Sequence, residues 1–469
     1  MFLEHDTIVA PATIPGTGAI SIVRLSGPDS VALADSILDI DLSDASGYTA
    51  HHAYIQEKTG EILDEVVVTV FRAPRSFTGE DSVEISCHAS SYIVSRIVYL
   101  LLEAGARDAE PGEFTQRAFL AGKMDLAQAE AVADLIASQN SAAHKIALSQ
   151  LRGGVSSELK EMRAKLLEIT SLMELELDFS EEDVEFADRT GLAKLAEEVM
   201  AHIDRLCESF RLGNAIKNGV PVAIVGSVNT GKSTLLNALL GEDRAIVSDI
   251  PGTTRDTVED TVVVGGTLFR FIDTAGIRET SEYVEKIGIE RTLSKIGTAD
   301  IIIHVIDSSS SHEVILQEVG SIVSKVNFRE QNLIIALNKV DICEVNKKVA
   351  LIDRLVSYIE NLGVKAYFAE ISAKQGTGID SLKEQLKLIQ SNRENSISGT
   401  MISNSRHYSA LLKASESLSR VRASLSSRIP TDLVAQDLRE TLYHLGTITG
   451  EISTDEVLGE IFGKFCIGK

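Results

Sequence analysis

The sequence predicts a multidomain protein of the α/β and α classes, because the spacing of its apolar residues changes along the 469 positions. Runs of β-branched residues dominate region 1–120, and a helical spacing of about 3.6 residues follows in 121–215. Region 216–388 alternates strands with helices, as parallel α/β domains do, and helical spacing returns in 389–469. We therefore expect an N-terminal α/β domain and a discontinuous helical domain with a second α/β domain inserted in it.

Three segments justify the α/β assignment of the first region. Gly18–Arg24 and Glu65–Phe71 are rich in β-branched residues and are bounded by glycine, proline or charged residues, which is typical of strands. Ser91–Glu103 has the apolar spacing of a helix, and Gly105 should end it. This region is predicted to end near residue 120.

The first helical part has apolar residues on one helical face, at Ala129, Val132, Ala133 and Ile136. A longer helix follows, whose apolar positions are Leu159, Met162, Leu166, Ile169, Met173 and Leu177. The acidic run Asp178–Glu185 closes this part. Its carboxylates could hold a metal ion, but a solvated loop is the simpler interpretation.

The second helical part follows the polar segment Ser391–Ser405, which predicts a linker. Two apolar stripes come after it: Leu411, Ala414, Leu418, Val421 and Leu425 in the first, and Val434, Leu438 and Leu445 in the second. Both stripes are typical of core packing. Because neither helical part alone makes a convincing bundle, we expect the two parts to pack together.

Composition restricts the possible partners and the compartment. The 68 acidic and 45 basic residues give a net charge of −23, which argues against a broad basic surface that grips nucleic acid unaided. Cys87, Cys207, Cys343 and Cys466 are scattered, with no CxxC pair, so a reducing cytoplasm is expected. No apolar run approaches the roughly 18 residues of a membrane span, and the N-terminus lacks the basic region of a signal peptide.

The segment Gly226–Ser233 has the GxxxxGKS pattern of a phosphate-binding loop, between an apolar strand at 221–225 and a helix at 234–240. In such a loop, backbone N–H groups at a helix N-terminus surround phosphate oxygens. Lys232 is expected to reach the β- and γ-phosphates, and the Ser233 hydroxyl to bind Mg²⁺.

Three further motifs follow in the order that a GTP-binding domain requires. Gly252–Asp256 offers a second hydroxyl for Mg²⁺, from Thr254, and Asp273–Gly276 follows the strand 268–272. Asn338–Asp341 follows the strand 333–337, and its carboxylate can accept from both N1–H and the exocyclic amine of guanine. Ser372–Lys374 completes the base pocket. The predicted GTP-binding residues are Asn229, Thr230, Gly231, Lys232, Ser233, Thr234, Ser248, Thr253, Thr254, Asp273, Thr274, Ala275, Gly276, Asn338, Lys339, Asp341, Ser372, Ala373 and Lys374.

The hydrolytic machinery must differ from that of Ras-like enzymes, which place a water-orienting glutamine directly after the DTAG motif. Ile277 occupies that position and cannot orient water. Asn229 and the loop Glu242–Arg255 could instead hold a monovalent cation beside the bridge between the β- and γ-phosphates, where an arginine finger would otherwise supply charge.

Longer stretches of the chain are distinctive as well. They are GSVNTGKSTLLNALLGEDRAIVSDIPGTTRD, DTAGIRETSEYVEKIGIER and the terminal FCIGK, together with DTIVAPATIPGTGAISIVRLSGPDS, SFTGEDSVEISCHAS and PGEFTQRAFLAGKMDLAQAEAVADLI. In these stretches, and so over essentially its whole length, the chain closely resembles the MnmE (TrmE) family of bacterial and organellar tRNA-modification GTPases.

The resemblance implies a folate-binding domain similar to aminomethyltransferases at 1–120, helical parts at 121–215 and 389–469, and a Ras-like P-loop G domain at 216–388. It also implies a potassium-stimulated GTPase. With the flavoprotein MnmG (GidA), which carries the FAD, members add an aminomethyl or carboxymethylaminomethyl group at C5 of the wobble uridine of certain tRNAs. A 5-formyl or 5,10-methylene derivative of tetrahydrofolate donates the carbon. The implied assembly is a cytoplasmic homodimer joined through its N-terminal domains, with G domains that approach each other when GTP and K⁺ are bound and with tRNA contacts largely on MnmG.

Individual roles are implied in the same way. Potassium ligands would be Asn229, Ser248, Ile250 and Thr253, and the catalytic residues would be Lys232 and Glu285, the second of which orients the attacking water. Folate ligands would be Arg24, Glu84, Lys123 and Lys469, since a carboxylate suits the pteridine edge and cations suit the glutamate tail. Without the resemblance these four residues would be interpreted as surface charges. Cys466 matches a family cysteine near the folate site, although a packed thiol is the simpler interpretation.

One short segment departs from the pattern of the family. His88-Ala-Ser90 stands where family members commonly have His-Gly-Gly, so the edge of the folate pocket should be bulkier. A ribosome-assembly GTPase of the Era or Der type would share the G-domain motifs, but it would add a basic KH module or a second P-loop, and neither is found. A nucleotide-gated scaffold without one-carbon chemistry is the other rival, and the implied folate ligands argue against it.

Overall fold

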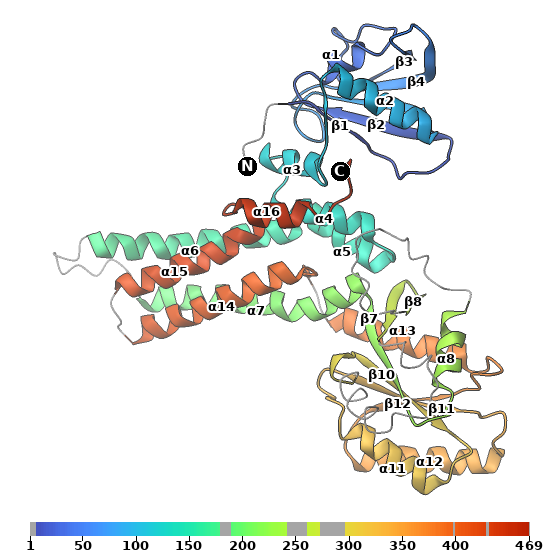
Figure 1. Ribbon diagram of the computed structural model, residues 1–469. Helices are drawn as coiled ribbons and strands as arrows, with labels where there is room; N and C mark the ends of the chain where they lie inside the picture. Colours follow the sequence, from blue (N-terminus) through green and yellow to red (C-terminus); the bar gives the residue numbers. More distant parts are fainter. Residues whose placement is uncertain are drawn as a thin grey trace. The chain divides into compact units, whose positions relative to one another are not determined.

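The computed structural model describes residues 6–178, 189–241, 260–272, 296–396, 399–427 and 431–468 (Figure 1). The chain forms two compact units. The first comprises residues 1–133, 150–199 and 413–469, and the second comprises residues 134–149 and 200–412. Their boundaries fall within or beside helices, so each unit combines one α/β region with part of the helical region.

The first unit contains a six-stranded sheet in the order β3-β4-β5-β2-β1-β6. All its pairings are antiparallel except that of β1 with β6. The strands are β1 (Ile8–Pro11), β2 (Ile20–Ser26), β3 (Thr49–Gln56), β4 (Ile62–Phe71), β5 (Ser82–His88) and β6 (Arg107–Asp108).

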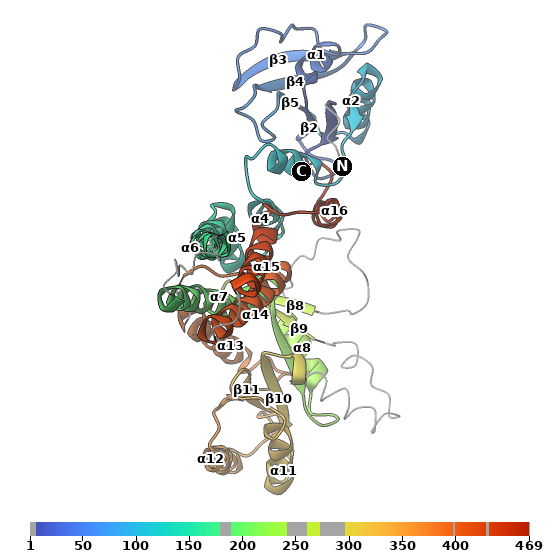
Figure 2. The same cartoon turned by 90° about the vertical axis from the view of Figure 1, so that its left-hand side faces the viewer.

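One face of this sheet is covered by α1 (Ser30–Asp35) and α2 (Ser91–Ala104), and α2 can be followed along the sheet in Figures 1 and 2. The covering helices bury alternate residues of the strands, such as Val66, Val68 and Val70 of β4. The strands predicted at 18–24 and 65–71 and the helix predicted at 91–103 are confirmed. Gly105 ends α2 at a φ of +117°, as expected of a helix C-terminal glycine.

Besides α1 and α2, the helices of the described residues that belong wholly or partly to the first unit are α3 (Glu113–Leu120), α4 (Leu126–Ala137), α5 (Ser141–Leu151), α6 (Gly154–Asp178), α7 (Arg189–Asn218), α14 (Ser405–Ser426), α15 (Thr431–Thr449) and α16 (Asp455–Phe462). α6 packs on α15, where Nη1 of Arg163 donates to the Leu442 carbonyl at 2.7 Å. The predicted contact between the two helical parts is therefore confirmed, and the predicted apolar stripes of α14 and α15 are buried.

The second unit contains a six-stranded sheet in the order β12-β11-β10-β7-β9-β8, in which only β8 is antiparallel to its neighbour. Its strands are β7 (Val220–Val225), β8 (Asp260–Val264), β9 (Thr267–Phe271), β10 (Ile301–Asp307), β11 (Asn332–Asn338) and β12 (Ala366–Glu370). α8 (Lys232–Leu240) and α13 (Ile379–Ser396) pack on one face. α11 (His312–Val323) and α12 (Val345–Asn361) pack on the other.

Two details differ from the sequence expectations. The linker predicted at 391–405 is too long, because α13 continues to Ser396 and α14 begins at Ser405. Polar composition is compatible with the end of an exposed helix, and no glycine or proline interrupts the chain between Gly378 and Gly399. Ile136, predicted on the apolar face of the first helical part, is 50% exposed at the end of α4.

Candidate guanine-nucleotide and folate sites

The phosphate loop joins the carboxyl end of β7 to the first turn of α8, as the motif predicts. Asn229 adopts a left-handed backbone conformation with a φ of +64°, which asparagine tolerates better than most residues. Gly231 precedes the helix at a φ of +97°, and a Cβ there would lie 2.2 Å from Nδ2 of Asn338. Only glycine therefore fits this position. Lys232, Ser233 and Thr234 form the first turn of α8, where backbone N–H groups favour an anion.

Lys232 lies over the phosphate loop. Its Nζ donates to the carbonyls of Gly226 and Ser227 at 2.8 and 2.7 Å. The charge of Lys232 also acts on His304 of β10, which is buried. Burial first, and this charge second, lower the pKa of His304 to about 4. His304 is therefore neutral near pH 7.

Asn338 links the phosphate loop to the segment Ser372–Lys374, the base loop, which is predicted to complete the pocket for the guanine base. It ends β11, and its Nδ2 donates to the Thr230 carbonyl at 2.8 Å while its Oδ1 accepts from the Ala373 backbone N–H at 2.9 Å. The side chain is 3% exposed, so both bonds are shielded from water. The structure thus brings the 226–233, 338–341 and 372–374 motifs to one edge of the sheet.

The base loop itself has a buried and an exposed part. Ser372 and Ala373 are buried, and the backbone N–H of Ser372 donates to the Thr377 carbonyl at 2.9 Å. Asp341 and Lys374 are exposed, and Gln375 donates to the Asp341 carboxylate at 3.4 Å. The Asp341 carboxylate, which is predicted to bind guanine, is therefore accessible beside the base loop.

Several predicted G-domain residues lie outside the described part of the chain: Ser248, Ile250, Thr253, Thr254, Asp273, Thr274, Ala275, Gly276, Ile277 and Glu285. The acidic run 179–185 and Lys469 lie outside it as well. Within the described residues, no group of three or more histidine, cysteine or acidic side chains is arranged to hold a metal ion.

Sequence reasoning missed Asp307 and Glu318. Asp307 ends β10 and pairs with Lys339 at 2.6 Å, and Glu318 of α11 accepts from the Ser227 hydroxyl at 2.6 Å. The signal for Asp307 was available, because it is a carboxylate at the end of an apolar run in the same region as Asn338. No comparable signal marks Glu318.

In the first unit, Arg24 and Glu84 are directly opposite on β2 and β5, and they form an ion pair at 2.8 Å. The guanidinium of Arg24 lies over the rings of Phe77 and Phe114, at 5.9 and 5.6 Å from their centroids. Two of the four predicted folate ligands therefore lie together on the sheet. Lys123 instead donates to the Pro74 carbonyl at 2.8 Å, beside the loop that carries Phe77.

The C-terminal tail contacts the N-terminal domain of the same chain. Nη1 of Arg24 is 3.5 Å from the Gly468 carbonyl, and the Gly112 backbone N–H donates to the Cys466 carbonyl at 3.4 Å. A Cβ on Gly468 would lie 2.2 Å from the Pro11 carbonyl oxygen, so the tail approaches β1 closely. The tail therefore returns to the N-terminal domain of the same subunit, which brings the end of the chain beside Arg24, as a folate site shared by Arg24 and Lys469 requires. The Cys466 side chain is exposed rather than packed.

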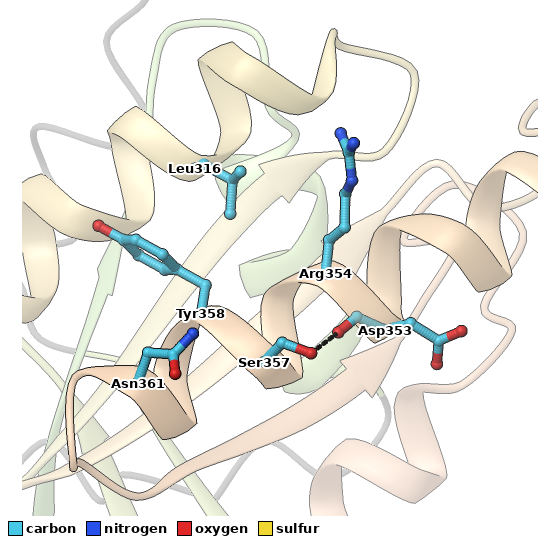
Figure 3. A pocket seen from close by; sticks show the side chains of 6 residues that line it. All are labelled: Leu316, Asp353, Arg354, Ser357, Tyr358 and Asn361. Carbon is cyan, nitrogen blue, oxygen red and sulfur yellow. Dashed lines mark hydrogen bonds between the residues drawn. The ribbon is translucent and has the colours of Figure 1, made fainter.

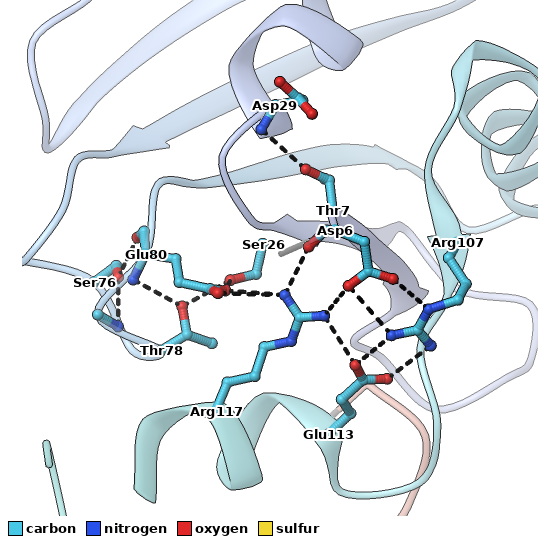
Figure 4. Close-up of polar contacts among 11 residues, drawn as sticks. Asp6, Thr7, Ser26, Asp29, Ser76, Thr78, Glu80, Arg107, Glu113 and Arg117 are labelled. Atoms are coloured by element: carbon cyan, nitrogen blue, oxygen red, sulfur yellow. Dashed lines mark hydrogen bonds and ion pairs between the residues drawn. The ribbon is translucent and has the colours of Figure 1, made fainter. Parts of the chain in front are cut away.

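A network of ion pairs in the first unit is drawn in Figure 4. The guanidinium of Arg117, which is 2% exposed, contacts Asp6, Glu80 and Glu113 at 2.7, 3.3 and 2.9 Å. Arg107 contacts Asp6 and Glu113 as well. Burial alone would raise the pKa of Asp6 and of Glu113, but hydrogen bonds from the two arginines outweigh it and lower both pKa values. The network ties the N-terminus and the 76–80 loop to α3.

His88 Nδ1 and backbone N both bond to the carboxylate of Asp64, at 2.7 and 2.9 Å, so the residue before the Ala-Ser departure is fixed. A surface pocket of about 360 Å³ lies between α11 and α12, and its lining side chains are drawn in Figure 3. None of the predicted site residues lines it.

Two family models, each of one domain, match this chain. The family described as GTP-binding protein TrmE N-terminus matches residues 7–123, and the MnmE helical domain matches residues 126–466. No helix in the described part of the chain is both long and apolar enough to cross a membrane.

Curated relatives match over nearly their whole length. The tRNA modification GTPase MnmE of Flavobacterium johnsoniae is 49% identical over 100% of both chains, and that of Bacteroides thetaiotaomicron is 50% identical over 100% of both. The relative from Cytophaga hutchinsonii is 49% identical over 99% of this chain and 98% of its own. This chain therefore belongs to the MnmE (TrmE) family, whose curated members carry the name tRNA modification GTPase.

Proposed function

We propose that this chain hydrolyses GTP as part of a tRNA modification reaction. The observation that carries the proposal is the buried side chain of Asn338, which bonds the phosphate loop at Thr230 and the base loop at Ala373. A nucleotide held at this edge would meet both loops in one fixed geometry. The exposed carboxylate of Asp341 would then accept from the two N–H groups that guanine offers and adenine lacks.

The chain's own residues have distinct roles in this proposal. Lys232 supplies a positive charge to the β- and γ-phosphates, and Ser233 and Thr254 hold Mg²⁺. Asn229, Ser248, Ile250 and Thr253 hold K⁺, and Glu285 orients the attacking water. The exposure of Asn229 in the loop supports its part of the assignment. When bound, the two cations neutralise charge that develops on the phosphate oxygens.

We further propose that the region around Arg24 binds a tetrahydrofolate derivative. Glu84 would accept from the pteridine, while Arg24, Lys123 and Lys469 would attract the carboxylates of the tail. The proximity of Arg24, Glu84 and the Gly468 carbonyl supports a site made partly by the C-terminal tail. The carbon would be transferred to C5 of the wobble uridine, with MnmG as the flavoprotein that carries FAD.

The proposed assembly is a cytoplasmic homodimer joined through the N-terminal domains, with MnmG and tRNA as partners. A net charge of −23 suits a protein whose tRNA contacts lie largely on its partner. The G domains of the dimer would approach each other when GTP and K⁺ are bound, while the folate site stays assembled.

Mass spectrometry of tRNA nucleosides tests the proposal. A strain that lacks this gene should lose the wobble modification, and complementation with the wild-type gene should restore it. Complementation with the Asp341→Asn gene should not restore it at normal nucleotide levels. A knockout with unchanged nucleosides but defective ribosome profiles would favour the ribosome-assembly alternative instead.

The potassium requirement has its own test. GTP turnover should be faster in KCl than in NaCl at matched ionic strength, because the smaller Na⁺ ion fits the spacing of the proposed oxygen ligands poorly. Equal turnover in the two salts would contradict the assignment of Asn229 and the 242–255 loop to a potassium site.

A further inference from the structure

Asp307 is the last residue of β10, and it is in register with Asn338 of β11. Its carboxylate accepts bonds on both oxygens. Oδ1 accepts from the backbone N–H and the hydroxyl of Ser309 at 3.0 and 2.6 Å, and Oδ2 accepts from Nζ of Lys339 at 2.6 Å. The position of this carboxylate is therefore fixed by its own loop, and the carboxylate in turn fixes the ammonium group of Lys339.

Lys339 lies between the two motif residues with direct roles in the nucleotide site. It directly follows Asn338, and it precedes Asp341 by two positions. Its backbone has a φ of +64°, a conformation that costs energy for a lysine and persists only where the surroundings impose it. The Ser308 backbone N–H donates to the Asn338 carbonyl at 3.0 Å, and that of Val340 donates to the Ile371 carbonyl at 3.2 Å. The backbone on both sides of Lys339 is thus bonded to neighbouring segments.

We propose that Asp307 is a positioning residue of the nucleotide site, which orders the side chain of Lys339 before the nucleotide binds. This inference rests on the proposed GTP-binding function. A free lysine side chain loses considerable rotamer entropy when it is immobilised, and that loss weakens any binding event that requires it. The ion pair at 2.6 Å already orders the Lys339 side chain in the folded protein. Nucleotide binding therefore does not have to immobilise this side chain.

The electrostatics agree with this role. Burial raises the pKa of Asp307, but hydrogen bonds from Lys339 and Ser309 outweigh burial and lower it, so the carboxylate is charged near pH 7. A carboxylate near a site for a polyanion would repel the ligand if it were unpaired. Lys339 compensates that charge, and neither residue is expected to function well without the other.

The test measures the dissociation of a fluorescent GDP analogue from the full-length protein by stopped flow, with Mg²⁺ and KCl present. Asp307→Asn should accelerate dissociation about tenfold, the loss expected for one charge-assisted hydrogen bond and its ordering effect. The preference for GDP over XDP should not change, because Asp341 reads the base. A changed base preference would overturn the positioning role.

Asp134→Asn is the matched control. Asp134 pairs with Lys217 at 2.7 Å, and the two side chains are 15% and 29% exposed, against 19% and 34% for Asp307 and Lys339. The control removes the same chemistry from the same unit but away from the nucleotide loops. It should leave GDP dissociation within twofold of wild type. Equal acceleration in both variants would show a general loss of stability, which would overturn the proposal.

A double-mutant cycle tests whether Asp307 acts through Lys339. Lys339→Met should accelerate dissociation, and adding Asp307→Asn should cause no further acceleration, because the pair has already been broken and the second change removes the unpaired carboxylate. Effects that multiply would show that Asp307 acts independently of Lys339. If Asp307→Asn does not fold, Ser309→Ala removes only the hydroxyl that bonds the carboxylate, and a two- to fivefold acceleration is expected, roughly the effect of one neutral hydrogen bond. Dissociation at the wild-type rate in Ser309→Ala would then contradict the proposal.

The wild-type measurement separates the two levels of inference. If the wild-type protein does not bind the GDP analogue, the proposed function fails, irrespective of Asp307. If it binds tightly and Asp307→Asn dissociates at the wild-type rate, only the positioning role fails.

Discussion

Replacement of Arg117 by methionine should destabilise the N-terminal domain by about 3 kcal/mol, because it removes one cation from a buried network with three carboxylates. Breaking a buried ion pair by removing one partner costs about 3–5 kcal/mol. We expect the low end of that range, since Arg107 still contacts Asp6 and Glu113 in the variant. Glu80 would keep its hydrogen bond from the Ser26 hydroxyl but would lose its guanidinium partner.

Arg420→Met is the matched control for this prediction. Arg420 also pairs with two carboxylates, Asp437 and Glu440, but its side chain is 48% exposed. Exposed ion pairs contribute about 0–1 kcal/mol, so this variant should be close to wild type. The comparison separates the effect of burial from the loss of an arginine.

Native-state hydrogen exchange is a suitable assay, read in α3 for Arg117→Met and in α14 and α15 for Arg420→Met, because a chain with several domains need not unfold in one transition. The loss of opening free energy, measured in the helices that carry the replaced ion pairs, should be larger in Arg117→Met by about 2 kcal/mol or more. A destabilisation of Arg117→Met no larger than that of Arg420→Met would refute the reasoning.

The pH dependence gives the same prediction a second readout. The pKa values of Asp6 and Glu113 are lowered in the folded protein, so their contribution to stability is fully present above the unfolded values, near pH 4, and is lost as the pH falls through the folded values. Arg117→Met should lose less stability in acid than wild type does. The difference in opening free energy between wild type and Arg117→Met should therefore shrink below about pH 4.

Three further predictions concern the proposed sites. Glu285→Ala should lower kcat roughly 10²-fold with little change in GTP affinity, because a water-orienting group does not hold the nucleotide; normal turnover in a steady-state assay would assign the role elsewhere. Asp341→Asn should shift the base preference from guanine toward xanthine, and unchanged GTP affinity in a titration would reject the base pocket. Deletion of Phe465–Lys469 should weaken folate binding and abolish tRNA modification but leave GTP binding nearly intact, because the tail contacts β1, β2 and the Gly112 backbone of the first unit; a truncated protein that modifies tRNA normally would make the tail structural only.

Features encoded by neighbouring residues could be predicted from the sequence alone. The phosphate loop, its strand and its helix lie within Val220–Leu240, and short-range spacing determines all three. The helices α6, α14 and α15 followed from the 3.6-residue spacing of their buried stripes. The end of α13 at Ser396 could not be predicted in this way, because polar residues near a helix end are compatible with either a helix or a linker.

Beyond the shared folate site that the family resemblance implied for Arg24 and Lys469, only the tertiary structure decided which distant groups meet. Arg24 and the Gly468 carbonyl are 444 positions apart, and Asp307 reaches Lys339 only because β10 and β11 are adjacent and in a particular register. The Arg117 network likewise joins the N-terminus, a loop and α3, and each of its residues alone would be interpreted as a surface charge. Such contacts depend on the order of strands and on the packing of separate segments, which no local pattern of residue types specifies.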